Sequence, residues 1–481
     1  MIFFNICKIF VKKNTCIIKM GRTHNHNRHC KCQKHHDRDL NLKIITKNIL
    51  EGFDYGDVVK GVEPDFAMGS ILNRGFTETP PPSLDDWAKA FYNMWEQNSG
   101  KDYFWAIKRM DRIAKELAAH NADIITLQND ALWTNQPSGY YNGDLRRGGD
   151  IQLLASVGTK DETYPEDERA YDFSKMLIER LRNNYGQKYV ILNQLFTTGE
   201  ECRRGLDGYA NATATVGSYL RITTLIKESI FKKACIKRQE NYNYFFSREI
   251  GPARFKLDDE TYWIGVDNSY GRGYVVADLK IKGQYVRILN THLASGYDLQ
   301  LFLNTEVPYE WIGNTNRYNS GAPARNVQSL ELLSKEIKTS PYPVILCGDF
   351  NSESNFEEPD PFYRFPTSPY ENLIGSGLLV DSGVAFLGEQ TLIDSETRYK
   401  TSGLRTPTNM AEWDQLRNED AFYSRRQDFI FFSKGKGITV KSFDVTQVTP
   451  DDPSPDVGNP FRFTAGHNGV VAELCFPNKH C

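Results

Sequence analysis

The residues best suited to chemistry follow a short apolar run at 343–346. From residue 347 to residue 352 the sequence reads Cys-Gly-Asp-Phe-Asn-Ser. Side chains two residues apart on a strand share a face, so Asp349 and Asn351 would lie together where the strand ends. A carboxylate can orient or deprotonate water, and an amide can donate to an oxyanion, so the pair suits attack on phosphorus. A strand-end aspartate is also common as a turn or capping residue.

Four other polar residues, far apart in the sequence, lie where a predicted hydrophobic strand begins or ends. They are Asn48, His292, Asp428 and His467. Taken singly, His292 is better explained as a core histidine bonded to backbone, and Asp428 can be explained as a strand cap. Together with the Asp349 pair, they favour a shared pocket along one edge of the sheets.

Hydrophobic periodicity predicts many strands with a few long helices between them. Apolar side chains recur at helical spacing over 105–120, 169–184 and 323–338. Shorter apolar or alternating runs predict strands, at 42–49, 123–127, 188–195, 260–266, 274–281, 285–292, 343–348, 428–433, 439–445 and 469–475. This arrangement predicts a layered α/β sandwich, with sheets inside and helices outside.

No linker rich in Pro, Gly or Ser divides the region that follows the first 40 residues. We therefore expect residues 41–477 to form one domain with two long insertions. The insertions are expected near 52–104, which contains three consecutive prolines, and near 134–167, which is rich in Gly, Asp, Pro and Tyr.

Six motifs occur in the order typical of a known family. They are Asn48 on the first strand, 122–128 (Ala-Asp-Ile-Ile-Thr-Leu-Gln), 290–293 (Asn-Thr-His-Leu), 348–351 (Gly-Asp-Phe-Asn), 427–430 (Gln-Asp-Phe-Ile) and 466–470 (Gly-His-Asn-Gly-Val). Arg325 and Gln328, on the helix before 348–351, also fit the pattern. The chain resembles the endonuclease/exonuclease/phosphatase superfamily, which has the DNase I-like fold. The resemblance implies a four-layer α/β sandwich, in which two mainly antiparallel sheets are flanked by helices.

The resemblance also implies Mg²⁺- or Mn²⁺-dependent cleavage of phosphoester bonds, with three residues handling the phosphate. His467 would contact the scissile phosphate and would be oriented by Asp428. His292 would bind a phosphate oxygen.

Three further residues would serve the attacking water and the transition state. Asp349 would orient or deprotonate the water. Asn351 and Asn48 would stabilise the pentavalent transition state through their amides.

The sequence departs from the family pattern at two metal-ligand positions. Where the family has a metal-binding glutamate this chain has Asn129, and before the final histidine it has Gly466 in place of an aspartate. Because Mg²⁺ is bound through few carboxylates, the loss of two should weaken its binding. Asn129, Glu51 and Asp349 remain candidate metal ligands, whereas Asp130 should point to the opposite face of an extended strand.

The pattern leads to a hypothesis of a divalent-metal-dependent phosphodiesterase, with nucleic acid as the first substrate class. Alternatives are a sphingomyelinase-like or inositol-phosphate phosphoesterase, and a module that binds phosphate or nucleic acid without cleaving it. Net charge is −3, but residues 1–38 hold nine Lys or Arg and one acidic residue. The acidic remainder argues against tight duplex binding and the basic tail argues for it.

The N-terminal tail, residues 1–40, is basic and rich in His and Cys. Its composition is that of a disordered polar segment, although a zinc-dependent interaction element is an alternative. The nine cysteines of the chain have no regular spacing, which favours free thiols in a reducing compartment. There is no run of 18 apolar residues and no clear signal peptide, so we expect a soluble, intracellular protein.

Overall fold

The computed structural model describes residues 39–49, 104–137, 170–204, 214–243, 253–257, 260–264, 272–294, 322–353, 368–395, 398–405, 422–446 and 467–477. The tail over residues 1–38, Glu51 and Gly466 lie outside these ranges, as does nearly all of both expected insertions. Within the described ranges, every helix is too short or too polar to span a bilayer.

The first sheet unites strands from the beginning, middle and end of the chain. Its strand order is β16-β17-β1-β2-β5-β4, with β3 beside β2. The strands are β1 (Leu40–Asn48), β2 (Ile124–Pro137), β3 (Ala170–Asp172), β4 (Tyr189–Arg204), β5 (Ala214–Lys227), β16 (Thr439–Val445) and β17 (Val470–Phe476). β1 runs parallel to β2, and the other pairings of this sheet are antiparallel.

The second sheet has the order β12-β15-β11-β10-β9-β6. Its strands are β6 (Cys235–Asn243), β9 (Gly273–Ile281), β10 (Gln284–His292), β11 (Val344–Asp349), β12 (Leu379–Asp381) and β15 (Asp428–Ser433). Only the β10–β11 pairing among these strands is parallel. Two short antiparallel strand pairs complete the described strands, β7–β8 (Ala253–Leu257, Glu260–Ile264) and β13–β14 (Ser402–Arg405, Phe422–Arg425).

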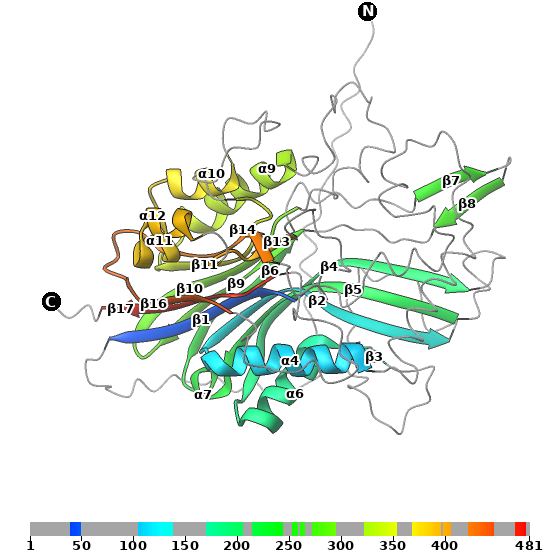
Figure 1. Cartoon of the computed structure of the whole chain (residues 1–481), viewed down its shortest axis with the longest axis horizontal. Helices are drawn as coiled ribbons and strands as arrows, with labels where there is room; N and C mark the ends of the chain where they lie inside the picture. Colours follow the sequence, from blue (N-terminus) through cyan, green and yellow to red (C-terminus); the bar gives the residue numbers. More distant parts are fainter. Residues whose placement is uncertain are drawn as a thin grey trace, which may run out of the picture.

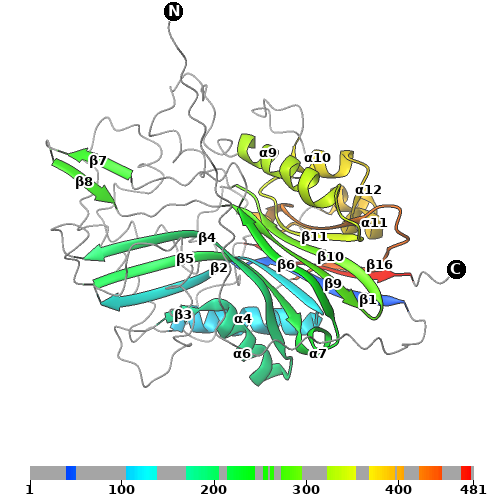
Figure 2. The same cartoon turned by 180° about the vertical axis from the view of Figure 1, so that it is seen from behind.

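Helices cover the outer faces of the two sheets (Figures 1 and 2). α4 (Phe104–His120) and α6 (Phe173–Tyr185) pack on the first sheet. α9 (Ala322–Leu332), the π-helix η5 that continues it (Leu333–Ile337) and α10 (Pro369–Gly375) pack on the second. Three short helices are α7 (Glu228–Phe231), α11 (Ser382–Leu387) and α12 (Glu389–Asp394).

Strand alternation explains how one strand serves two cores. Along β1, Ile44 points into the apolar layer between the sheets, whereas Ile45 packs with α4 and α6. The same alternation turns Lys47 towards α4 and Asn48 towards the second sheet, as their contacts with Glu116 and Asp349 show. The predicted sandwich of two mainly antiparallel sheets between helical layers is confirmed.

Two local differences from the sequence-based expectations concern the ends of elements. β2 continues to Pro137, where a loop was expected from residue 134, because it pairs with the long β5 on both sides of a bulge at Gln128 and Asn129. The helix expected over 323–338 is α-helical only as far as Leu332 and then forms the wider π turn.

Candidate functional site

Strand pairing places three of the candidate residues in one row across the second sheet. His292 ends β10, Asp349 ends β11, and they are register partners in the parallel pair. Asp428, the first residue of β15, is in turn the register partner of Asp349. Asn48 ends β1 in the facing sheet and reaches Asp349 across the gap, with its Nδ2 2.8 Å from Oδ2. The site therefore lies where strand ends from both sheets meet, near the centre of Figure 1.

A glycine allows this close approach. Gly348, one residue before Asp349, has a φ of +153° and faces Thr291 in the parallel pair. A Cβ at Gly348 would lie 2.0 Å from the carbonyl oxygen of Thr291, so any side chain would push β10 and β11 apart. The glycine of the Gly-Asp-Phe-Asn motif thus keeps His292 and Asp349 adjacent.

Asp349 is the centre of the polar contacts. Its Oδ1 accepts the backbone N–H of Asn351 at 2.8 Å, and its Oδ2 lies 3.4 Å from His292 Nε2 and 3.8 Å from His467 Nδ1. Burial alone would raise the pKa of Asp349, but His467 and His292, with the Asn48 amide, outweigh burial and hold the pKa well below its ordinary value. Asp349 is therefore a carboxylate over the whole neutral range.

Asp428 and His467 form an ion pair beside Asp349. His467 Nδ1 lies 2.8 Å from Asp428 Oδ2. Burial lowers the pKa of His467, but the carboxylates of Asp428 and Asp349 outweigh it and raise that pKa to about 9. Burial raises the pKa of Asp428 to about 6 against the attraction of His467, and the Asp349 charge adds to the rise. Between these values the imidazolium and both carboxylates are charged.

Two residues that the sequence patterns did not reveal support the site. The buried Arg272 places Nη1 2.7 Å from His292 Nδ1. The hydroxyl of Thr401 accepts the backbone N–H of Asp428 at 3.1 Å, and its carbonyl accepts that of Asn468 at 2.7 Å. Thr401 thereby ties Asp428 to the segment that carries His467. Neither residue stands out in the sequence, because neither belongs to a motif or ends a predicted core strand.

Asn351 departs from the strand geometry expected of it. Its φ of +47° is left-handed, so the chain turns immediately after β11. Its amide nevertheless comes back to the site, with Nδ2 3.1 Å from His292 Nε2 and 3.1 Å from the carbonyl oxygen of Leu293. Asn351 therefore joins the site through a turn that brings its amide back to the end of β10, and not through a strand face shared with Asp349.

The acidic groups present suit a hard divalent cation. Ligand atoms of Asp349, Asp428 and His467 all lie within 4.8 Å of one another, and this is the one such group among the described His, Cys, Asp and Glu residues. No described residue donates a hydrogen bond to the buried Oδ1 of Asp428. Carboxylate oxygens are the ligands that Mg²⁺ and Mn²⁺ prefer, so Asp349 and Asp428 would be the anionic ligands.

The other metal-ligand candidates have different outcomes. Asn129 is buried at a β-bulge with a φ of +51°, one residue beyond Gln128, the register partner of Asn48. Asp130 turns away from the site, as expected. Its carboxylate is bound by Thr223 at 2.6 Å and by Arg221 at 2.9 Å, deep in the first sheet.

Comparison with protein families identifies one match. The model of the Endonuclease/Exonuclease/phosphatase family matches residues 90–443, about three quarters of the chain. Asn48 and His467 lie outside the matched range, so their membership of the site depends on the contacts described above. Among curated proteins, none matches this chain.

Solved structures of similar extent come from bacteria and animals. An endonuclease/exonuclease/phosphatase family protein from Bacteroides thetaiotaomicron is 13% identical, with a TM-score of 0.39, and the match covers 92% of this chain and 98% of that one. A D. rerio TDP2 humanized by 14 mutations is 13% identical, with a TM-score of 0.37, covering 90% and 98%. A mannosyl-6-phosphatase from Bacteroides thetaiotaomicron VPI-5482 is 13% identical, with a TM-score of 0.36, covering 90% and 100%.

Proposed function

Since this chain belongs to the endonuclease/exonuclease/phosphatase family, we propose that it hydrolyses phosphodiester bonds at the Asp349–His467 site with Mg²⁺ or Mn²⁺. The single observation that carries the proposal is the charge arrangement at that site. A buried carboxylate, Asp349, lies 3.8 Å from an imidazole whose pKa is raised to about 9. Such a pair can offer a hydrogen-bond acceptor to an attacking water and a proton donor to the phosphoryl group that the water attacks.

His467 is the proposed proton donor. Because Asp428 engages Nδ1, the proton on Nε2 is the one that can be directed at a phosphoryl oxygen or at the leaving oxygen. Asp428 fixes the orientation of the ring and stabilises the imidazolium, as a carboxylate does for a catalytic histidine.

Asp349 is the proposed partner of the attacking water. Its depressed pKa makes it a weak base, so accepting a hydrogen bond from the water and orienting it is the better role. The neighbouring amides of Asn48 and Asn351 could then donate to the developing charge, and His292 to another phosphate oxygen.

A divalent cation bound by Asp349 and Asp428, with the amide oxygen of Asn129 as a neutral ligand, would offset negative charge developing on the phosphoryl oxygens. This chain supplies fewer anionic ligands than the family pattern, so weak metal binding is part of the proposal. For the substrate we favour the phosphodiester backbone of nucleic acid over a sphingolipid or inositol phosphate head group.

The test is hydrolysis of bis-p-nitrophenyl phosphate with Mg²⁺, with Mn²⁺ and after chelation. We expect metal-dependent turnover that Asp349→Asn abolishes. Asp278→Asn is the matched control, because Asp278 is an equally buried aspartate of the second sheet, bound to Arg287 and remote from the site. Single-stranded DNA, RNA, sphingomyelin and an inositol phosphate then rank the substrate classes. A folded protein without turnover on any of them would refute the proposal.

A second candidate function is phosphate or nucleic-acid binding without cleavage. The observation that favours it is Asn129, which stands where the family pattern has a metal-binding glutamate. Under this alternative, adding inorganic phosphate shifts the NMR signals of His467 and Asp349, and no turnover occurs at any metal concentration.

A further inference from the structure

A fully buried ion pair that the proposed chemistry does not use lies behind the site. The ammonium of Lys47, on β1, is 2.7 Å from Glu116 Oε1 on α4. The Lys47 side chain has no exposed surface, and that of Glu116 is 4% exposed. Relative to packed apolar side chains, such a pair adds little net stability, because both charges must be desolvated. Stability alone therefore does not explain a lysine at this position.

The second contact of Lys47 leads to the site. Its Nζ lies 3.0 Å from the backbone carbonyl oxygen of His467. That carbonyl lies just before β17, in a segment held by contacts outside the strand ladder. Thr401 accepts the N–H of Asn468, and Thr446 accepts the N–H of Gly469 through its hydroxyl. Lys47 adds a charged donor to the contacts that hold this segment.

A glycine allows the segment to lie against β1. A Cβ at Gly469 would be 3.0 Å from the Thr46 carbonyl oxygen and 3.2 Å from Lys47 Cβ, closer than such contacts normally are. The backbone after His467 is therefore pressed onto the last residues of β1, within reach of the ammonium.

We infer that Lys47 is a positioning residue that sets the place of His467 through its backbone carbonyl. His467 is then held at both ends, by Asp428 at the imidazole and by Lys47 at the main chain. Successive residues of one strand thus hold the two halves of the site, since Asn48 binds Asp349 on the other face of β1. The inference rests on the proposed function, because it gives Lys47 a part in catalysis through His467.

A double variant separates positioning from folding. Lys47→Met removes the ammonium and leaves Glu116 buried without it, so we expect Tm to fall by roughly 5–10 °C. Lys47→Met combined with Glu116→Met removes both charges, and Tm should return close to the wild-type value. The carbonyl of His467 still lacks its donor in the double variant, so we expect kcat to stay about 100-fold low with KM nearly unchanged.

Lys43→Met is the matched control. Lys43 lies on the same face of β1, four residues earlier, and its partly exposed ammonium lies 3.9 Å from Glu473. Its removal should leave kcat unchanged. Lys47→Arg, which keeps a cationic donor, should recover part of the lost kcat.

A readout in the metal-free protein tests the inference even if the enzyme proves inactive. The imidazole ¹H–¹⁵N signals of His467 at a fixed pH should move or broaden in the double variant and stay in place in Lys43→Met. A double variant in which both Tm and those signals match the wild type would overturn the inference, whatever the turnover. A wild type without turnover would refute the proposed function alone, and the NMR result would still decide whether Lys47 positions His467.

Discussion

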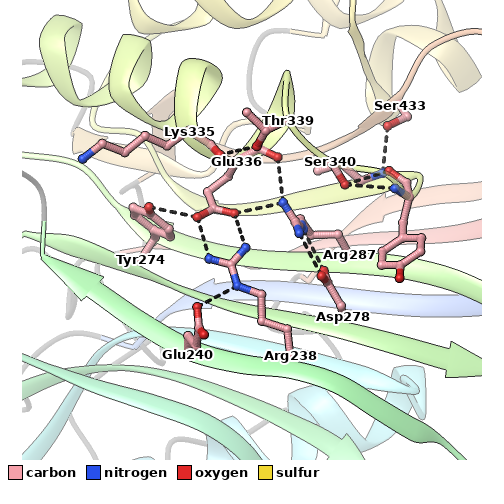
Figure 3. A network of polar contacts seen from close by, with 12 residues as sticks. Arg238, Glu240, Tyr274, Asp278, Arg287, Lys335, Glu336, Thr339, Ser340 and Ser433 are labelled. Carbon is pink, nitrogen blue, oxygen red and sulfur yellow. Dashed lines mark hydrogen bonds and ion pairs between the residues drawn. The ribbon is translucent and has the colours of Figure 1, made fainter. Parts of the chain in front are cut away.

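Two buried clusters of charge lie on the second sheet, and they differ in how completely their acceptors are used. The first, on the outer face beneath η5, joins Arg238, Arg287, Glu336, Asp278 and Tyr274 (Figure 3). All four carboxylate oxygens of its two buried acids accept hydrogen bonds. In the second cluster, at the strand ends, Asp428 keeps one buried oxygen to which no described residue donates.

The first cluster has a structural role, whereas the second has the features of a binding site. In the first cluster two arginines share the acids, and Arg287 also donates to the backbone carbonyl of Glu336 at 3.0 Å, which anchors η5 to the sheet. Every group has its partners, so nothing is left for a ligand. The site instead gathers two carboxylates and a protonated imidazole at unequal distances, with acceptor capacity left over. An incompletely satisfied buried group costs stability and is expected where a ligand completes it.

The largest predicted effect is on turnover. Asp428→Asn should lower kcat by about 10²–10⁴-fold, because His467 loses the anion that orients its ring and holds its proton. Asp278→Asn, in the other cluster, should leave kcat within about threefold while lowering stability by about 1–3 kcal/mol. Steady-state kinetics and urea denaturation of both variants measure the contrast, and equal losses of kcat would erase the distinction between the clusters.

The next effect concerns the stability that the first cluster, centred on Glu336, gives to the fold. Glu336→Gln removes the charge that three donors share, so we expect the free energy of unfolding to fall by about 2–3 kcal/mol. Glu331→Gln is the control on the same helical segment, where the loss of a pair with an exposed lysine should cost about 0.5 kcal/mol or less. Urea unfolding monitored by circular dichroism gives both values. A cost for Glu336→Gln no larger than that of the control would contradict the role given to the network.

A pH dependence of the free energy of unfolding should arise from His467. The folded-state pKa of His467 is raised to about 9 from an ordinary 6.5, so folding favours its protonated form. The resulting stabilisation is fully present below pH 6.5 and is lost as the pH rises through 9, on the order of 1–3 kcal/mol. Urea unfolding of chelated protein between pH 6 and pH 10 measures it. The slope should shrink in Asp428→Asn, and an unchanged slope would assign the effect to another group.

The smallest predicted effect concerns metal affinity and tests the absence of a carboxylate at position 129. Asn129→Glu places an acid where the resemblance predicts a metal ligand and should tighten Mn²⁺ binding by about tenfold, or about 1.4 kcal/mol. Asn121→Glu is the control, because Asn121 is an exposed asparagine with a similar left-handed φ of +48° and adds the same charge elsewhere. Isothermal titration calorimetry compares the two variants. Equal affinities would show that position 129 does not face the cation.

Periodicity located most strands and the long helices, because one face of each is buried against a sheet or helix. The periodicity did not predict the π turn in η5, because residues 333–337 have an ordinary helical pattern. The carboxylate of Glu336 in this segment is bound by arginines from distant strands. The periodicity also ended β2 too early, because the strand is extended by its pairing with β5 and not by local hydrophobicity.

Polar residues at strand ends marked much of the candidate site, including Asp349, Asp428 and His292. Lys47 lies on a predicted strand that also carries Lys43, so its charge alone did not mark it, and its partners lie 69 and 420 positions away. Arg272 and Thr401 were not marked either. Their importance depends on which segments they touch, and such contacts are not encoded in local spacing.

The sequence by itself determined the residue types at the strand ends and the alternation that sends neighbouring side chains to opposite faces, because both depend only on local backbone geometry. The tertiary structure alone decided that Asp349 stays ionised although it is buried, that His467 keeps its proton above its ordinary pKa, and that Lys47 meets the backbone behind the site. Those properties come from burial and from charges brought together by chain segments that are 39 to 420 residues apart, and such energies exist only once the sheets have packed.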